Sequence, residues 1–139
     1  MLHYIYKLIQ ICSDTCGSSR DVWMHVLHDL LFRLPNAAIV SRDGSIFFTD
    51  ASYKYSFEDH ILDIMEARPH GRLLMYDPKT RSTITLLDNL YFANGVALSG
   101  NEDFLVFCET TMYTLALFLQ SGFGITFVFL VIVLFDGIS

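Results

Sequence analysis

The chain has 139 residues, which is the length of one modest domain with room for a real core. Its composition is 53% hydrophobic and 17% charged, and an apolar content this high excludes global disorder. Nine Lys and Arg against fifteen Asp and Glu give a formal net charge of −6. Because no basic surface is available to neutralise a phosphate backbone, we expect no nucleic-acid partner.

Residues 1–34 carry only weak signals. The first twelve are apolar with polar interruptions, and no small-residue cleavage site follows them cleanly, so a signal peptide is not supported. Cys12 and Cys16 miss the two-residue gap of metal and redox pairs. His25 and His28 would share one face of a predicted helix, which is more typical of a surface helix than of a metal site.

The middle of the chain repeats itself. The segment PNAAIVSRDGSIFFTDAS, from Pro35, aligns with ANGVALSGNEDFLVFCETT, from Ala93, and places Asn36 on Asn94 at an offset of 94 − 36 = 58 residues. Each copy has two apolar runs separated by a turn rich in Gly, Asn and Asp, the residues that tolerate left-handed backbone. The pattern predicts strand, turn, strand in both copies.

The second predicted strand of each copy ends in a carboxylate. Asp50 lies opposite Glu109 once one extra residue in the second copy is allowed. We expect both side chains to accept hydrogen bonds from backbone N–H groups at the strand ends. Cys108, inside the second of these strands, is expected to be a small buried hydrophobic residue.

A helix is predicted in the insertion 53–70. Ser56 is the expected N-cap, with Asp59 at the third helical position. Apolar residues recur at helical spacing at Phe57, Ile61, Ile64 and Met65. The helix is expected to pack over one rim of the sheet, with His60 and His70 solvated beside it.

Two further strands are predicted between the copies, over 72–76 and 83–87, joined by a turn at Pro78. With the first copy they complete four antiparallel strands. A second unit begins with strands over 95–98, 104–108 and 112–118. Four short strands repeated at this spacing are typical of a β-propeller blade.

The C-terminal region is almost devoid of charge. No charged residue occurs from Thr110 to Phe135, and ITFVFLVIVLF fills 125–135. A membrane segment over 117–135 is one interpretation, since a bilayer core needs about 20 apolar residues as a helix. The alternatives are a buried core segment or a tail foreign to the domain, because the stretch is β-branched and lacks flanking Lys or Arg.

The stretch 43–111 resembles the strictosidine synthase-like family, especially its plant members. The motifs that carry the resemblance are DGSIFFTDAS, HGRLLMYDP, LYFANGVALS and a closing CET, in order and at gapless spacing. The resemblance implies a six-bladed propeller related to the paraoxonases, to calcium-dependent lactonases and to the adipocyte plasma membrane-associated protein. We therefore expect a mainly β, incomplete propeller of about two blades, with an inserted helix and a hydrophobic C-terminal segment.

In such relatives calcium lies at the propeller axis, held by asparagines at the inner ends of blades. Asn36 and Asn94 match these positions, although Ala37 stands where the family often has an aspartate. Calcium takes six to eight oxygen ligands, so two asparagines do not complete a site. Tyr55 matches a substrate-pocket tyrosine of strictosidine synthase. The catalytic glutamate of that enzyme lies in a later blade of the family, so no catalytic residue is assigned here.

The expected organisation is a divergent, partly helical segment (1–34), the conserved propeller region (35–114) and a hydrophobic tail (115–139). The first functional hypothesis is a truncated, hydrolase-like member, related to arylesterases and lactonases and acting on a small molecule, that lacks the catalytic set. The second is a non-catalytic interaction or membrane-tethered protein. True strictosidine synthesis is less favoured. The resemblance also implies the secretory route, vacuole or endoplasmic reticulum, and open blade edges predict self-association.

Overall fold

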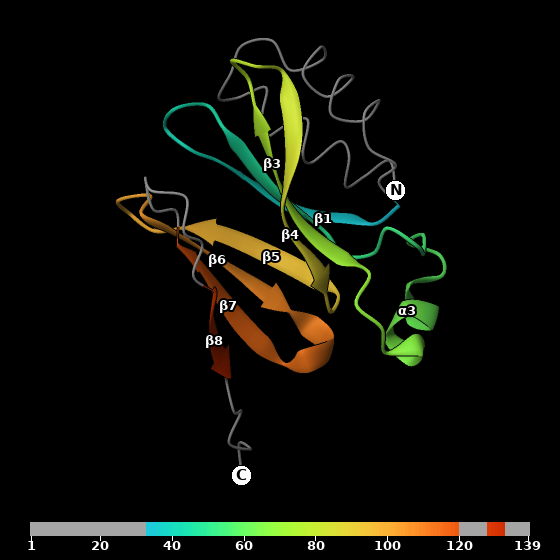
Figure 1. Ribbon diagram of the computed structural model, residues 1–139. Helices are drawn as coiled ribbons and strands as arrows, with labels where there is room; N and C mark the ends of the chain where they lie inside the picture. Colours follow the sequence, from blue (N-terminus) through green and yellow to red (C-terminus); the bar gives the residue numbers. More distant parts are fainter. Residues whose placement is uncertain (1–32, 120–127, 133–139) are drawn as a thin grey trace.

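The computed structural model describes residues 33–119 and 128–132, which form two antiparallel sheets and one short α-helix (Figure 1). The strands of the first sheet are, in spatial order, β1 (Pro35–Val40), β2 (Ile46–Asp50), β3 (Gly71–Asp77) and β4 (Ser82–Leu90). Those of the second are β5 (Ala93–Leu98), β6 (Phe104–Glu109), β7 (Thr114–Leu119) and β8 (Val128–Ile132). Within each sheet, every strand pairs with the next one along the chain, so the prediction of a mainly β chain is confirmed.

The sequence repeat is also a repeat of strand register. Pro35 of β1 pairs with Asp50, and Ala93 of β5 pairs with Glu109. In both pairs the register shifts just after this point, after Pro35 in β1 and after Asn94 in β5. A β-bulge bends the strand and re-aims the side chains beside it. The two sheets therefore share an irregular first strand as well as their strand order.

The carboxylates at the ends of β2 and β6 hold the backbone that enters β1 and β5. The backbone N–H of Leu34 donates to Asp50 Oδ1 at 3.2 Å, and that of Tyr91 donates to Glu109 Oε1 at 2.7 Å. This role was predicted from the sequence and is confirmed. Asp50 is fully buried and also pairs with Arg72. Burial raises the pKa of the Asp50 carboxyl, and the Arg72 guanidinium opposes that rise.

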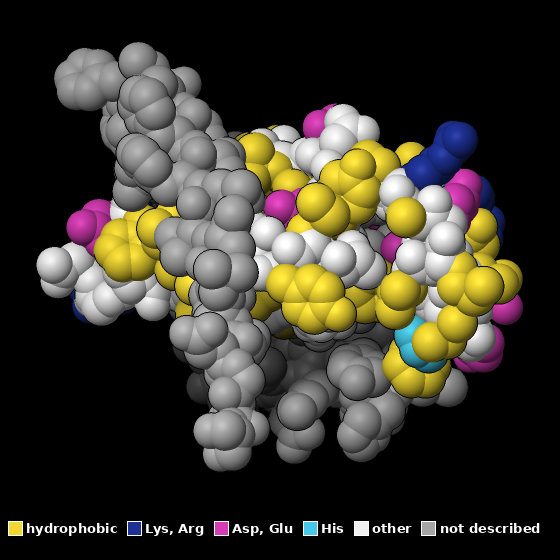
Figure 2. Space-filling model, turned by 90° about the horizontal axis from the view of Figure 1, so that it is seen from below, with side chains coloured by type: hydrophobic (Ala, Val, Ile, Leu, Met, Phe, Trp, Pro, Cys, Tyr) yellow, Lys and Arg dark blue, Asp and Glu magenta, His cyan; other side chains and the backbone are white. Residues whose placement is uncertain are grey.

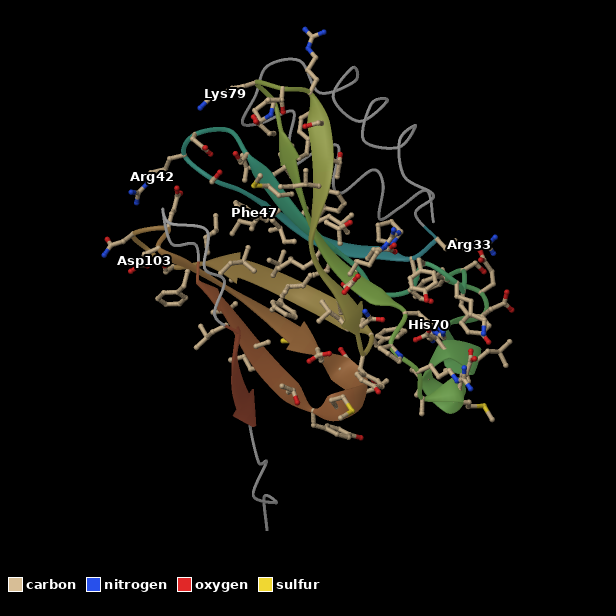
Figure 3. The ribbon with its side chains drawn as sticks, in the orientation of Figure 1. Arg33, Arg42, Phe47, His70, Lys79 and Asp103 are labelled. Atoms are coloured by element: carbon tan, nitrogen blue, oxygen red, sulfur yellow. The ribbon has the colours of Figure 1, made fainter. Side chains whose placement is uncertain are left out.

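The turns that follow β1 and β5 touch each other. The backbone N–H of Arg42 donates to both carboxylate oxygens of Glu102, at 3.0 and 3.1 Å, and its guanidinium donates to the carbonyl of Gly100 at 2.6 Å. Figure 3 shows Arg42 and Asp103 at the same end of the molecule. Gly44 has φ of +88°, a left-handed conformation that favours glycine. The two hairpins are thus joined at their tips by polar contacts.

The core lies between the two sheets, where β1 packs beside β5 (Figure 3). Its buried members come from both sheets: Phe47, Leu73, Leu90, Ala93, Leu105, Phe107 and Ala116. Leu105 and Phe107 alternate along β6, as expected for a strand with one face turned inward. Cys108 lies in β6 as predicted, but it is half-buried rather than buried.

The predicted helix exists as α3 (His60–Glu66), but its cap and its orientation differ from the prediction. Asp59 occupies the N-cap position, so the assignment of Ser56 as the cap is wrong. The only buried residue of the helix is Asp63. His70 was expected to be solvated and is instead 6% exposed, with its Nδ1 2.9 Å from Oδ1 of the buried Asp63. The buried contacts of Asp63 with Ser52 and His70, rather than the apolar residues of the helix, therefore determine which face of the helix turns inward.

Part of the C-terminal region is β-structure. β7 and β8 pair antiparallel, with Phe118 opposite Val128, so the described residues of 117–135 lie in strands. No helix among the residues that the structure describes is long and apolar enough to cross a bilayer. The other residues of the tail and most of the segment 1–34, with Cys12, Cys16, His25 and His28, lie outside the described ranges.

Candidate functional site

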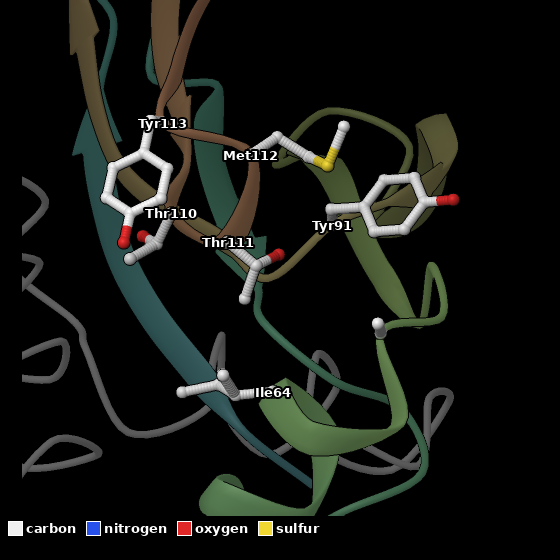
Figure 4. Close-up of a pocket in the computed structure, with 7 residues that line it drawn as sticks. Ile64, Tyr91, Thr110, Thr111, Met112 and Tyr113 are labelled. Atoms are coloured by element: carbon white, nitrogen blue, oxygen red, sulfur yellow. The ribbon is translucent and has the colours of Figure 1, made fainter.

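A pocket of about 480 Å³ lies between α3 and the short 3-10 helix η1 (Thr110–Met112) that links β6 to β7 (Figure 4). The residues that line it are Ile64, Ala67, Tyr91, Thr110, Thr111, Met112 and Tyr113. Its walls combine apolar side chains with hydroxyl groups, and none of these lining residues is charged. Such a lining suits an uncharged, largely apolar ligand with a few groups that form hydrogen bonds.

Three segments far apart in sequence make this pocket. The end of α3 contributes Ile64 and Ala67, and Ala67 takes the left-handed conformation at the helix C-cap, with φ of 52°. The connection between β4 and β5 contributes Tyr91, whose N–H is held by Glu109. The segment after β6 supplies the rest, and Tyr113 ends η1 with φ of 50°. The inserted helix and two connections, β4 to β5 and β6 to β7, therefore shape one cavity.

A buried polar cluster attaches α3 to the first sheet. Asp63 Oδ1 accepts a hydrogen bond from Ser52 Oγ at 2.6 Å and lies 2.9 Å from His70 Nδ1. Ser52 is fully buried and Asp63 is 2% exposed. The rings of Tyr53 and Tyr55 stand edge-on to the His70 ring, with centroids 5.4 and 5.9 Å apart. This shell separates much of the cluster from solvent.

A second anchor of α3 is nearer the surface. Glu66 accepts hydrogen bonds from Lys54 Nζ at 2.6 and 2.8 Å and from the Tyr55 hydroxyl at 2.7 Å. The hydrogen bonds from Lys54 and Tyr55 lower the pKa of Glu66, and Glu66 in turn raises the pKa of Lys54. The middle of the helix, through Asp63, and its last residue, Glu66, are thus tied to the segment that leads into it.

The Ser52, Asp63 and His70 cluster does not have the arrangement of a hydrolase triad. In a triad the histidine takes the proton of the serine, and the aspartate orients the histidine from its other side. Here Ser52 Oγ donates to the carboxylate itself, and the same oxygen contacts His70 Nδ1. Because the serine proton faces Asp63 rather than the imidazole, this geometry supports a structural connection.

The two asparagines predicted as calcium ligands occupy equivalent positions. Asn36 is the second residue of β1 and Asn94 is the second residue of β5, and both lie at the irregular part of their strands. Asn94 Oδ1 accepts from the N–H of Gly95 at 2.8 Å, and its Nδ2 donates to Thr110 Oγ1 at 3.1 Å. The side chain of Asn94 therefore already braces the start of β5 against η1.

The two asparagine side chains match calcium in donor type but not in number. Amide oxygens are the hard ligands that calcium prefers, so the donor type fits. The number does not fit, because calcium takes about six to eight oxygens with carboxylate charge among them. Within the described ranges, no group of three or more His, Cys, Asp or Glu side chains could hold a metal ion. Residues 33–119 therefore do not complete a calcium site.

Tyr55, predicted as a pocket residue, bonds to Glu66 and is not among the residues that line the cavity. The structure therefore places it beside the cavity wall, and its contact with a substrate stays a prediction. Sequence reasoning missed Tyr91 and the run from Thr110 to Tyr113 as pocket residues. The available signal was the position of the closing CET motif, because the chain after Glu109 must turn at the rim of the second sheet.

Comparison with known proteins gives the family. A family model described as strictosidine synthase matches residues 36–122, which is more than half of the chain. The chain belongs to the strictosidine synthase-like family. The matched region ends at 122, whereas the conserved propeller region was expected to end at 114. All residues of the candidate site thus fall inside the strictosidine synthase-like region.

Relatives occur in plants and in mammals. The chain is 45% identical over 106 residues to Protein STRICTOSIDINE SYNTHASE-LIKE 6 of Arabidopsis thaliana, a match that covers 76% of this chain and 28% of the relative. It is 51% identical over 105 residues to Protein STRICTOSIDINE SYNTHASE-LIKE 7 of the same plant, with the same coverage of both chains. It is also 51% identical over 78 residues to the adipocyte plasma membrane-associated protein of Mus musculus, covering 55% of this chain and 19% of that protein. The chain therefore spans less than a third of the length of these relatives.

Proposed function

We propose that the two sheets are neighbouring blades of a six-bladed propeller. Two observations support the proposal: each sheet is a four-stranded antiparallel meander, and their first strands, β1 and β5, lie side by side. Neighbouring blades of a propeller meet through their innermost strands in this way. An antibody against residues 43–111 tests the proposal on endogenous protein. A band at a mass much higher than that of the 139-residue chain supports a complete ring. A band at the mass of the 139-residue chain contradicts it.

The function that the site supports best is the binding of a neutral, largely apolar small molecule, with hydrolase-like chemistry of the arylesterase and lactonase type in the complete propeller. The observation that carries it is the uncharged lining of the pocket between α3 and η1. A protonated amine, such as the amine partner of a Pictet–Spengler condensation, would need a carboxylate nearby. Strictosidine synthesis is therefore the less favoured activity.

Binding is tested with the full chain and an uncharged fluorescent probe, N-phenyl-1-naphthylamine. Thr111→Leu adds apolar bulk inside the pocket, and Thr85→Leu makes the same change on the exposed side of β4. We expect Thr111→Leu to weaken probe binding at least fivefold and Thr85→Leu to leave it unchanged. Equal binding by the two variants would refute the assignment of the pocket. Hydrolysis of 2-naphthyl acetate, followed in parallel, tests the catalytic part of the proposal.

Calcium enters only as a proposal for the complete ring, where Asn36 and Asn94 would supply two of its oxygen ligands. Their equivalent placement in β1 and β5 supports this role. The test is the melting temperature with calcium and with EDTA, for wild type and for Asn36→Ala. Calcium-dependent stabilisation that disappears in the variant supports the assignment. An equal calcium effect in both proteins contradicts it.

A second candidate is a non-catalytic, membrane-associated or interaction protein of the secretory route. The observation that favours it is the apolar surface of α3, where Ile61, Leu62 and Met65 are half-exposed or more. Figure 2 shows that hydrophobic side chains also occupy much of the described surface seen from below. Membrane fractionation and sedimentation velocity of the purified chain test this candidate. A monomer that stays in the supernatant would rule out both tethering and self-association through open blade edges.

A further inference from the structure

The helix α3 is attached to the protein by its polar side rather than by an apolar one. A surface helix normally turns its apolar stripe toward the core. In α3 the buried residue is Asp63, and the exposed apolar residues are Ile61, Leu62, Ile64 and Met65, at 53%, 50%, 41% and 75%. None of them belongs to the apolar clusters of the described core. A helix of seven residues is too short to persist alone. Hydrogen bonds must therefore supply the stabilisation that apolar packing usually gives to such a helix.

Asp63 is the centre of those hydrogen bonds. Its Oδ1 is 2.6 Å from Ser52 Oγ and 2.9 Å from His70 Nδ1. Ser52 precedes the helix in the chain and His70 follows it, so one carboxylate oxygen gathers the two ends of the insertion. The ends are also joined directly, because the N–H of Tyr53 donates to the carbonyl of His70 at 2.9 Å. Ser52 Oγ in turn accepts from the N–H of Tyr55 at 3.0 Å.

The same helix forms a wall of the pocket. Ile64 follows Asp63 directly, and Ala67 is the C-cap of the helix. Figure 4 shows Ile64 on α3 at one side of the cavity, with the residues of η1 at the other side. A movement of α3 away from the sheet would displace both residues together. The cavity therefore depends on the contacts that keep Asp63 in place.

We propose that Asp63 is a positioning residue for this pocket: its buried hydrogen bonds to Ser52 and His70 fix α3 as the wall that a neutral apolar ligand contacts. The assignment of the pocket as a ligand site rests on the proposed function above. The dependence of α3 on Asp63 is a property of the fold and is tested separately.

The first measurement is hydrogen exchange of the full chain with Asp63→Ala and with Asp59→Ala. Asp59 is the matched control, because it is the exposed N-cap residue of the same helix, makes no side-chain cap bond, and its carboxylate accepts from the Ser56 hydroxyl at 3.3 Å rather than from a buried partner. We expect Asp63→Ala to speed exchange of the α3 amides at least tenfold while the amides of β6 keep their wild-type rates. Asp59→Ala should change neither. Equal α3 exchange in the two variants would overturn the proposal.

Two further variants separate positioning from unfolding. Asp63→Asn retains an oxygen acceptor and should restore part of the protection of α3, whereas Ser52→Ala removes one donor and should lose part of it. If Asp63→Ala does not fold, the exchange rates of Asp63→Asn and Ser52→Ala decide whether the hydrogen bonds of Asp63 hold α3. A wild-type level of α3 protection in Ser52→Ala, together with a fully unprotected α3 in Asp63→Asn, would contradict the hydrogen-bond mechanism.

The second measurement is binding of N-phenyl-1-naphthylamine to the same proteins. We expect Asp63→Ala to weaken binding at least fivefold, Asp63→Asn to weaken it less, and Asp59→Ala to leave it unchanged. A wild-type protein that binds no probe refutes the proposed function, and the exchange result still decides whether Asp63 holds α3. Wild-type affinity in a variant whose α3 exchanges rapidly would refute the link between the helix and the pocket.

Discussion

Gly71 lies where three segments of backbone meet, and it provides the sharpest test of the fold. It is the first residue of β3, and a Cβ built on it would lie 2.8 Å from the carbonyl oxygen of Leu90, 2.9 Å from the nitrogen of Ala93 and 3.2 Å from the carbonyl oxygen of Ala51. Real Cβ atoms essentially never approach within 3.0 Å. Since the neighbours are backbone atoms, no side chain can rotate away, and Gly71→Ala must move the end of β4 or the start of β5.

The size of the effect follows from this geometry. Overpacking a tight site costs about 1–3 kcal/mol, and two contacts with backbone place Gly71→Ala near the upper end, at about 3 kcal/mol. For a chain of this length that corresponds to a fall in melting temperature of about 10 °C. Gly95→Ala is the matched control, because nothing lies within 4 Å of its added Cβ.

The assay is urea and thermal unfolding of both variants, followed by circular dichroism. A glycine that an alanine can replace without strain usually gains about 0.4–1 kcal/mol, because the unfolded chain loses conformations. We therefore expect Gly95→Ala to equal or slightly exceed the wild type. If Gly71→Ala were as stable as Gly95→Ala, the close approach of β3, β4 and β5 would be wrong.

Three other predictions concern the core, the helix anchor and the turn contact. Phe107→Ala should lower the free energy of unfolding by about 3–5 kcal/mol, because Phe107 is buried between the sheets, and Phe104→Ala, at a half-buried position, should lower it less in the same urea titration. The pKa of Glu66 is lowered from its ordinary 4.5 by the hydrogen bonds from Lys54 and Tyr55, so its contribution to stability is present above pH 4.5 and is lost as the pH falls through the lowered pKa. The melting temperatures of wild type and Glu66→Gln should accordingly converge below that pH, and a constant difference would contradict the anchor. A double-mutant cycle of Arg42→Ala and Glu102→Ala should show a coupling below about 1 kcal/mol, because the Arg42 side chain is 73% exposed.

The strands were predictable because their signals are local. Alternating apolar residues and turns such as 42–45 act within a few residues, and the 58-residue repeat carried the same pattern from β1 to β5. The roles of Asp50 and Glu109 also followed from the repeat, because both carboxylates lie at the end of a strand, where backbone N–H groups are the nearest donors.

The orientation of α3 was not predictable from the same rules. Helical spacing of Ile61 and Ile64 indicated a core-facing side, yet spacing alone cannot say that Asp63 has Ser52 and His70 as buried partners. The pocket was missed for a related reason. Its walls come from α3, from Tyr91 and from η1, and only the tertiary arrangement brings them together.

The polar attachment of α3 and the apolar lining of the pocket have a common physical basis. If α3 were packed through Ile64 and its apolar neighbours, those side chains would fill the space beside η1, and the cavity would close. Turning Asp63 inward instead leaves Ile64 available to the cavity, and the buried carboxylate is tolerated because Ser52 and His70 satisfy it. An ordinary helix that packs through an apolar stripe gains stability when an apolar residue replaces a carboxylate on its buried face. Here the same exchange at Asp63 should release the helix, because the partners Ser52 and His70 would remain buried without their acceptor.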